Sequence, residues 1–516
     1  MVVRDHRRAV SWLVSTGSVT LFLLLVAVAY AFFLSAGQFD SWFQWTAFYD
    51  AQAEGFRAGH LYVAEPAPPE LQVLIDPLNP ANIKHWRWDY SYYDGRLYIY
   101  WGLVPAALLA VAKTLLQIRA TVGDEVIAFF FLIGRALAGV LIIREFARHH
   151  DPEPPTWAVW LAATVVAFAN PIPIMLSRPA IYEASIAAGS CFMLLGTYFA
   201  LRALHAEREA GTLLWLLSAS FGLGLAAGAR ISLQPAVVLM LALTVFVLWR
   251  IGGAGIRRFG RLLVCGAMPA MLVVGSQLLL NYLRFGLWNE FGTSYQMTAP
   301  RFHIGARFVI PNLYLYLLEP IGRKSCWFPF FSAQWYTAKR VLPEWLSHPA
   351  DYFSDEPNVG LLRFVPFVWL IFGGIGLSLW DTWRRQESRC SARKLLTDTW
   401  RVRWAWGVFT IWTVGAAMPI LLAFMFTMRY QADFTAALLL LATLAGWRIL
   451  ATPESRTSRS IVVAIYVTLA TTTVIFGLLL GFGEDYSNNF KLHNPGLMTR
   501  LEELLSLCRW RRHWPF

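Results

Sequence analysis

The apolar residues of this chain gather into runs of roughly 20, the length that a helix needs to cross a hydrocarbon core about 30 Å thick. Backbone groups inside a bilayer must pair with one another, so only helices and closed barrels can span it, and barrel strands do not produce such runs. The composition agrees, because 57% of the residues are hydrophobic and 15% are charged, against about 25% charged in soluble domains. The sequence therefore excludes a soluble multidomain enzyme, a coiled coil and a disordered scaffold. It predicts an all-α polytopic membrane protein.

Positive charge is concentrated in the short segments between the apolar runs. The formal net charge of +12 could by itself indicate nucleic-acid binding. The basic residues instead follow the pattern of cytoplasmic loops in membrane proteins, so we expect no nucleic-acid partner. The preference for Arg over Lys is typical of a GC-rich bacterial genome, which suggests the bacterial cytoplasmic membrane as the location. The basic segments are residues 144–150, 202–208, 250–261, 384–394 and 448–459.

The predicted spans form one transmembrane module over residues 1–482, followed by a tail at 483–516. The first span, at about residues 12–36, is too long for a signal-peptide core and is expected to be a retained helix with a cytoplasmic N-terminus. Residues 37–97 and 286–359 are then expected to be two large extracytoplasmic loops. The other predicted spans are residues 98–117, 125–147, 157–177, 183–204, 212–229, 231–250, 262–283, 361–382, 404–426, 433–449 and 460–482.

These spans do not place all of the basic segments on the same side of the membrane, so the prediction is 12–13 helices. Two spans between residues 97 and 144 would place the basic segment 144–150 outside. Either residues 98–124 hold a re-entrant element, or one span has been merged or missed. The five Cys residues show neither CxxC nor metal-ligand spacing, so no zinc site and no disulfide pairing is predicted.

The first external loop holds the densest set of acidic and aromatic residues. Trp42, Trp45, Tyr49 and Phe56 recur at helical spacing, which predicts an amphipathic helix in the membrane interface. Asp50 and Glu54 share a face of this helix, where a solvated polar face is the simpler interpretation. Asp40 follows the first span directly and is a candidate catalytic acid.

A second aromatic segment, residues 86–98, contains Asp89 and Asp94. Asp94-Gly95 between β-favouring residues predicts a hairpin turn, which is the simpler explanation of Asp94. Aromatic rings beside carboxylates also suit carbohydrate binding, because sugar C–H faces pack on rings while the hydroxyls bond to acids.

Several basic residues lie at predicted external helix ends, where a cation is costly and is usually paired or functional. Arg matches a phosphate group by a bidentate fork, although reaching the lipid headgroups would explain each residue equally well. Arg429 and Asp433 are four residues apart and could neutralise each other. The residues of this set are Arg178, Arg230, Arg284 and Arg429, and Glu183 is an acid at another helix mouth.

Four segments resemble, in order, the bacterial members of the GT-C superfamily of integral-membrane glycosyltransferases. The layout also resembles GT-C proteins, with one helix, a large external loop that opens with an acid, and many further helices. This superfamily includes the protein O-mannosyltransferases and the aminoarabinose transferases, which use polyprenyl-phosphate sugars. The resemblance implies a GT-C-like fold and a lipid-linked sugar donor. The segments are residues 93–105, 224–230, 281–286 with 290–292, and 429–434.

The resemblance also implies that an acid in the first external loop is the general base or holds a divalent metal ion. Asp40 has the matching position. The paired acids common in the superfamily are absent here, because Ser41 follows Asp40 and Ala51 follows Asp50, so Asp50 is a rival candidate. The remaining acids and the basic residues are expected to bind substrate. They are Asp89, Asp94, Glu183, Arg230, Arg284, Glu290 and Arg429.

The implied reaction moves a sugar from polyprenyl phosphate to an extracytoplasmic glycan, lipid or protein. An Arg stabilises the charge that builds on the departing phosphate, a carboxylate removes the acceptor proton, and a single displacement inverts the anomeric carbon. Two alternatives stay open. One is a flippase or transporter for lipids or lipid-linked sugars, and the other is a membrane acyltransferase, although the His residues here lie mostly in loops.

Overall fold

Most of the chain is described by the computed structural model, and the side chains of residues 378–399 are not. Much of the predicted second loop, between residues 332 and 350, lies outside the described part, as do the first residues of the predicted first span. The described residues are 16–150, 152–253, 255–298, 302–320, 322, 325–331, 343, 346, 349, 351–353, 356–384, 392–453, 455–483 and 489–508.

Nine helices in the described residues are long and apolar enough to cross a membrane, which confirms the predicted all-α membrane class. Six of these spans are single helices whose bounds match the elements α2 (Thr16–Leu34), α6 (Asp124–His149), α9 (Ile181–Leu204), α10 (Glu209–Ala229), α12 (Ile256–Phe285) and α18 (Arg456–Gly481). The other three lie in η2 and α11 (Ile231–Leu233, Gln234–Ile251), in α16 (Ala392–Leu421), and in η7 and α17 (Met428–Gln431, Ala432–Ala451).

Shorter elements complete the described part of the chain. Before α6 lie α3 (Phe48–Arg57), α4 (Pro69–Gln72), η1 (Pro80–His85), β1 (Ser91–Tyr93), β2 (Arg96–Tyr98) and α5 (Val104–Leu116). Then follow α7 (Thr156–Phe168), α8 (Ile172–Ser177), η3 (Thr293–Tyr295), η4 (Ala306–Phe308), α13 (Val309–Leu318), α14 (Leu361–Phe364), η5 (Pro366–Trp369) and α15 (Leu370–Arg384). The last two are α19 (Asn489–His493) and α20 (Pro495–Leu505).

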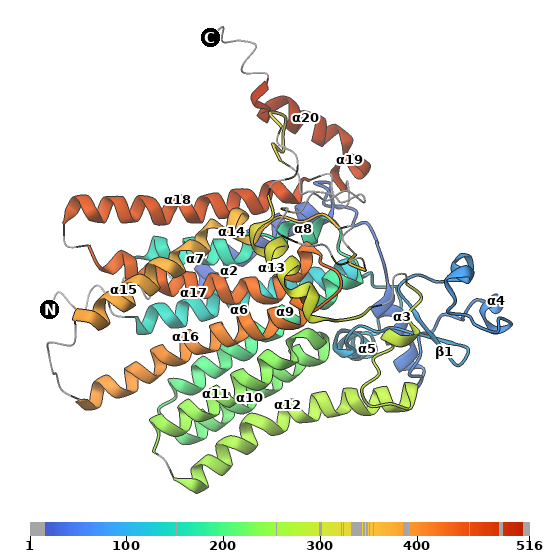
Figure 1. The fold of residues 1–516 in the computed structure, drawn as a ribbon, viewed down its shortest axis with the longest axis horizontal. Coiled ribbons are helices and arrows are strands. Elements are labelled where there is room, and N and C mark those ends of the chain that lie inside the picture. The colour runs from blue at the N-terminus through green and yellow to red at the C-terminus, as the bar shows by residue number, and fades with distance from the viewer. Residues whose placement is uncertain are drawn as a thin grey trace.

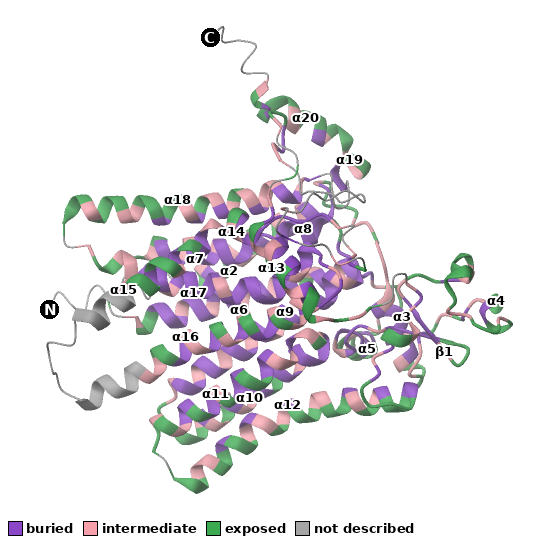
Figure 2. Cartoon of the chain, in the orientation of Figure 1, coloured by how far each residue is buried: buried purple, intermediate pink, exposed green. Residues whose placement is uncertain are grey.

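The long helices lie side by side in one bundle (Figure 1). The end of the bundle that carries α3, α5 and the β1–β2 hairpin is called the site end here, and the opposite end is called the loop end (Figure 1). Figure 2 shows that the outer faces of α12 and α18 are largely exposed, and 22% of the residues in their apolar windows are buried, against 78% for α9. Exposed apolar side chains on α12, such as Leu272 at 62%, suit contact with lipid.

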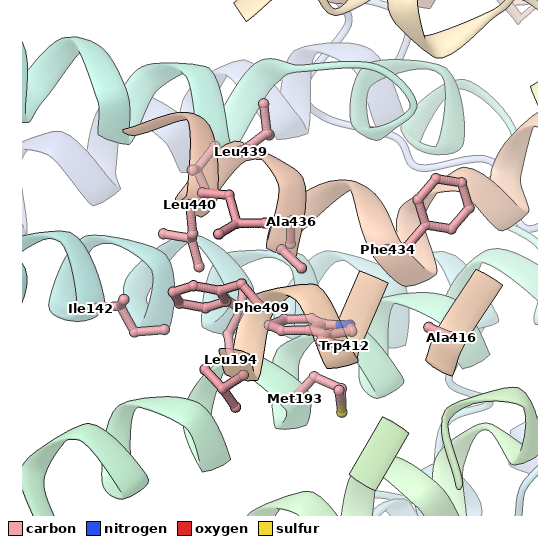
Figure 3. Packing of buried hydrophobic residues seen from close by; sticks show 14 of the residues in the cluster. Ile142, Met193, Leu194, Phe409, Trp412, Ala416, Phe434, Ala436, Leu439 and Leu440 are labelled. Atoms are coloured by element: carbon pink, nitrogen blue, oxygen red, sulfur yellow. The ribbon is translucent and has the colours of Figure 1, made fainter. Parts of the chain in front are cut away.

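The centre of the bundle is packed by large side chains from α16 against α17, α9 and α6. Phe409 and Trp412 of α16 lie between Leu440 of α17 and Leu194 of α9 (Figure 3). The indole of Trp412 also donates a hydrogen bond to the backbone oxygen of Asp433, at 2.8 Å. A buried indole N–H needs such a partner, and this bond fixes the start of α17, which carries residues of the candidate site.

The span predicted at residues 98–117 is wrong. Its helical part, α5, has 13 residues and is about 20 Å long at 1.5 Å per residue, too short to cross the bilayer. It packs against α3 at the site end instead (Figure 1). The first long loop therefore extends to residue 123, and α6 brings the basic segment 144–150 to the loop end. With one span fewer before it, this segment lies on the same side of the membrane as the other basic segments. The predicted count of 12–13 spans is not reproduced among the described residues. Nine helices there are long and apolar enough to cross a membrane, and α7 is among the apolar helices that are shorter than these.

The span predicted at residues 157–177 is interrupted. It is divided into α7 and α8 by Asn170 and Pro171, and the last carbonyls of α7 lose their helical partners. Two side chains from other helices replace these partners. Arg135 of α6 donates to the oxygen of Val166 at 2.7 Å, and Tyr30 of α2 donates to that of Ala167 at 2.7 Å.

A disulfide that the cysteine spacing did not predict joins Cys326 to Cys508, with the Cα atoms 5.2 Å apart. It connects the second long loop to the C-terminal tail, whose helices α19 and α20 lie at the site end (Figure 1). The described residues 489–508 of the tail are thus covalently attached to the loop.

Candidate functional site

A half-buried carboxylate, Asp89, forms the centre of a polar cluster at the site end. Its Oδ1 atom accepts hydrogen bonds from the hydroxyl of Tyr182 at 2.7 Å and from that of Tyr100 at 3.2 Å. The two hydroxyls are 2.8 Å apart. Burial raises the pKa of Tyr100 well above its usual value, so this phenol stays protonated and remains a donor. Asp89 is therefore held as an oriented carboxylate.

Arg429 lies against the ring of the same tyrosine. Its guanidinium carbon is 4.3 Å from the centroid of Tyr182, within the range of a cation–π contact. The guanidinium also pairs with Glu356, at 2.8 Å, and with Glu183, at 3.6 Å. One aromatic side chain thus contacts both the carboxylate of Asp89 and the buried guanidinium of Arg429.

A second guanidinium, that of Arg230, enters the cluster from the turn between α10 and α11. Its Nε atom lies 2.8 Å from both carboxylate oxygens of Asp433, and Ser232 donates to the same carboxylate at 3.0 Å. Asp433 therefore pairs with Arg230 rather than with Arg429, which corrects the pairing expected from their spacing. Tyr430 connects the two halves, because its ring centroid is 4.7 Å from the Arg230 guanidinium carbon and 5.8 Å from that of Arg429.

Acidic groups outnumber basic groups in this Asp89 cluster. Its described ionisable members are the four acids Asp89, Glu183, Glu356 and Asp433 and the two basic residues Arg230 and Arg429. The cluster therefore offers both carboxylate oxygens and guanidinium N–H groups to a ligand.

Asp50, one of the two predicted catalytic acids, is buried in an ion pair. Its Oδ1 atom lies 2.6 Å from the ammonium of Lys113 on α5 and also accepts from the backbone N–H of Val122 at 3.0 Å. Glu54 lies 2.5 Å from the same ammonium, and that contact lowers the pKa of Glu54. These contacts attach α3 to α5.

Asp40, the other predicted catalytic acid, is exposed just after α2. Its carboxylate accepts from the hydroxyl of Ser41 at 3.4 Å. Within the described part of the chain, no hydrogen bond or ion pair joins Asp40 to the Asp89 cluster. Its catalytic role stays a prediction.

The predicted hairpin around Asp94 is confirmed, since β1 and β2 pair antiparallel across it. Asp94 is exposed and has a φ of 49°, a left-handed conformation that Asp tolerates in turns. These observations support a turn role for Asp94.

Arg284 and Glu290 lie under the hairpin rather than in the Asp89 cluster. Arg284 donates to the backbone oxygen of Ile99 at 3.2 Å and to the side chain of Asn281 at 3.0 Å. Glu290 accepts from the backbone of Gly292 at 2.6 Å and stabilises the turn that follows α12. Arg178 is exposed between α8 and α9.

Four members of the cluster, Asp89, Glu183, Arg230 and Arg429, were predicted from the sequence as site residues, and the other members were not. Tyr182 precedes Glu183, but a tyrosine at the start of a helix does not by itself indicate a functional site. Glu356 and Tyr100 lie far from the others in the chain, and only the fold brings them together. The one group with metal-ligand spacing in the described residues, at Glu145, lies at the loop end and not in this cluster.

Comparison with known proteins gives no family model and no curated relative that matches this chain. Several solved structures are similar to it, and two of them are described here. The oligosaccharyltransferase AglB from Archaeoglobus fulgidus has 14% identity and a TM-score of 0.48, over 90% of this chain and 56% of AglB. ArnT from Cupriavidus metallidurans has 13% identity and a TM-score of 0.42, over 93% of this chain and 78% of ArnT. The AglB structure holds an inhibitory peptide and a dolichol-phosphate, and the ArnT structure holds undecaprenyl phosphate. The chain spans little more than half the length of AglB.

Proposed function

We propose that this protein is a membrane glycosyltransferase that moves a sugar from a polyprenyl-phosphate donor to an extracytoplasmic glycan, lipid or protein. The observation that carries the proposal is the contact of Tyr182 with both Asp89 and Arg429. This contact brings a carboxylate that can accept a proton close to a guanidinium that can bind phosphate. The pair lies at one end of a membrane bundle, where a lipid-linked substrate can reach it.

The carboxylate of Asp89 suits the role of general base. Its Oδ1 atom is held by two phenols, whereas Oδ2 makes no hydrogen bond to any residue that the structure describes and can accept a proton. In the proposed step the acceptor oxygen bonds to the anomeric carbon as the bond from that carbon to the phosphate oxygen breaks. The acceptor proton moves to Asp89, and the bonding electrons leave with polyprenyl phosphate. A single displacement inverts the anomeric configuration.

The reaction also requires that the negative charge on the departing phosphate be stabilised. Arg429 and Arg230 offer guanidiniums that bind phosphate by charge-assisted hydrogen bonds. Both already pair with acids, so a phosphate has to compete with those carboxylates for the guanidinium N–H groups. Carboxylate oxygens are ligands for Mg²⁺ and Mn²⁺, and acids such as Asp89 and Glu356 would offer them to a divalent cation. When bound, such a cation would supply positive charge beside the phosphate.

The proposed orientation places the site end outside the cytoplasm of a bacterial inner membrane. The Cys326–Cys508 disulfide at this end supports it, because disulfides persist in oxidising compartments such as the periplasm. The basic segments at the loop end also support it, since Lys and Arg are enriched in cytoplasmic loops.

The test is to incubate the purified protein with a panel of radiolabelled polyprenyl-phosphate hexoses and pentoses, an envelope fraction as acceptor source, and Mg²⁺ or Mn²⁺. We expect release of polyprenyl phosphate and a labelled acceptor. Arg429→Lys should weaken donor binding, because an ammonium cannot reproduce the guanidinium fork. Arg119→Lys, at an exposed arginine just after α5, serves as the matched control. Transbilayer movement of the intact donor without its consumption would show a flippase instead.

A further inference from the structure

The loop end of the bundle holds a second polar cluster, which the proposed reaction does not use. A buried acid, Glu145 of α6, lies 3.5 Å from Arg148 and 3.7 Å from Arg202 of α9. The rings of His149 and His205 stack with their centroids 3.8 Å apart. Arg401 of α16 donates to the backbone oxygen of Leu204, next to His205, at 3.2 Å. These six ionisable residues from three helices are called the loop-end cluster below.

Part of this cluster has the geometry of a metal site. Ligand atoms of Glu145, His149 and His205 all lie within 4.8 Å of one another. Each histidine uses Nδ1 for a backbone carbonyl at 2.9 Å, which leaves Nε2 for a ligand, as is common among histidines that bind metals. A divalent cation is therefore the first alternative to consider.

The charges around the cluster oppose a divalent cation. The guanidiniums of Arg148 and Arg202 already contact the carboxylate of Glu145, and that of Arg401 lies beside His205, bonded to the oxygen of Leu204. A metal ion at Glu145 would displace the first two and would then lie near like charges. An anion would instead be attracted by these guanidiniums, which bind phosphate by charge-assisted hydrogen bonds.

We propose that the loop-end cluster binds the phosphate group of an anionic phospholipid. Two helices of the membrane bundle, α6 and α9, end here among basic segments, and basic sites between helices at this level bind lipid headgroups. The guanidinium carbon of Arg202 also lies 4.8 Å from the ring centroid of Trp215, and tryptophan is enriched at the membrane–water interface. A free phosphate ion offers the same chemistry, so the experiment separates the two sources.

The experiment measures the thermal unfolding midpoint of the full chain in a neutral detergent, with four additives titrated separately. The additives are short-chain phosphatidylglycerol, short-chain phosphatidylcholine, inorganic phosphate and Zn²⁺. We expect phosphatidylglycerol to raise the midpoint, and the other three to leave it unchanged at the same concentrations. Stabilisation by inorganic phosphate equal to that by phosphatidylglycerol would overturn the assignment to a lipid.

Three variants locate the effect. Arg202→Gln should weaken the apparent affinity for phosphatidylglycerol about tenfold, since one charge-assisted bond is lost. The matched control Arg459→Gln, an exposed arginine at the same end of the bundle, should not change it. Glu145→Gln removes the competing carboxylate and should strengthen phosphatidylglycerol binding. Binding of Zn²⁺ that Glu145→Gln abolishes, with phosphatidylglycerol affinity unaffected by Arg202→Gln, would overturn the proposal in favour of a metal site.

Discussion

The buried ion pair between Asp50 and Lys113 gives the sharpest test of how the first external loop is built. The side chain of Lys113 is 1% exposed and that of Asp50 is 8% exposed. Lys113→Met removes the ammonium and keeps most of the side-chain volume. The carboxylate of Asp50 is then buried with the backbone N–H of Val122 as its remaining partner.

The expected loss follows from the burial of the pair. Removing one partner of a buried ion pair costs about 3–5 kcal/mol, because the other charge is left uncompensated. Glu54 adds little to this loss, since its side chain is 34% exposed and water solvates it after the change. We therefore expect Lys113→Met to lower the free energy of unfolding by about 3–4 kcal/mol. The double variant Asp50→Asn/Lys113→Met removes both charges and should recover most of this loss.

The assay is thermal or chemical unfolding of the three variants in one detergent, with glycosyl transfer measured on the folded fraction. We expect the double variant to be more stable than Lys113→Met alone and to keep its activity. If Lys113→Met were as stable as the wild type, the proposed attachment of α3 to α5 would be refuted. If the folded double variant were inactive, Asp50 would regain the catalytic role first predicted for it.

Three further predictions concern the framework of the bundle. Tyr30→Phe leaves the oxygen of Ala167 without its donor and should cost about 1–3 kcal/mol of unfolding free energy, measured by thermal unfolding. Trp412→Phe loses the bond to the backbone of Asp433 and opens a small cavity, so a similar loss is expected in the same assay. Cys508→Ser should abolish the reductant-dependent shift in gel mobility that the 182-residue separation of the disulfide predicts, and an unchanged shift would contradict the pairing.

Hydrophobic run length was enough to predict the membrane class, and Asp94-Gly95 was enough to predict the hairpin. The apolar stretch at 98–117 shows where this reasoning ends, because its composition matches that of a span. What distinguishes α5 is Lys113, which lies at the site end beside Asp50 and Glu54. That pairing depends on the tertiary structure, so it cannot be inferred from the run of apolar residues.

The candidate site could be predicted in its residue types but not in its grouping. Arg230 and Arg429 stood out as cations at helix ends, yet the partner of Asp433 proved to be Arg230, about 200 residues earlier in the chain. A helical spacing of four favoured Arg429 instead, but Arg429 lies in the 3₁₀ turn η7 before α17 begins, so the α-helical spacing does not apply to this pair. The carboxylate of Asp89 is oriented by a hydrogen bond from Tyr182, which lies at the start of α9.

The central claim is that Asp89 accepts the proton of the acceptor, and one comparison tests it most directly. Release of polyprenyl phosphate is measured for the wild type, Asp89→Asn, Asp40→Asn and the turn control Asp94→Asn, each corrected for folded protein. Removing a general base costs about 10²–10⁴ in rate, so we expect a loss of this size for Asp89→Asn and near-normal turnover for Asp94→Asn. Full turnover by Asp89→Asn would contradict the claim, and a loss confined to Asp40→Asn would return the catalytic role to the acid that follows the first helix.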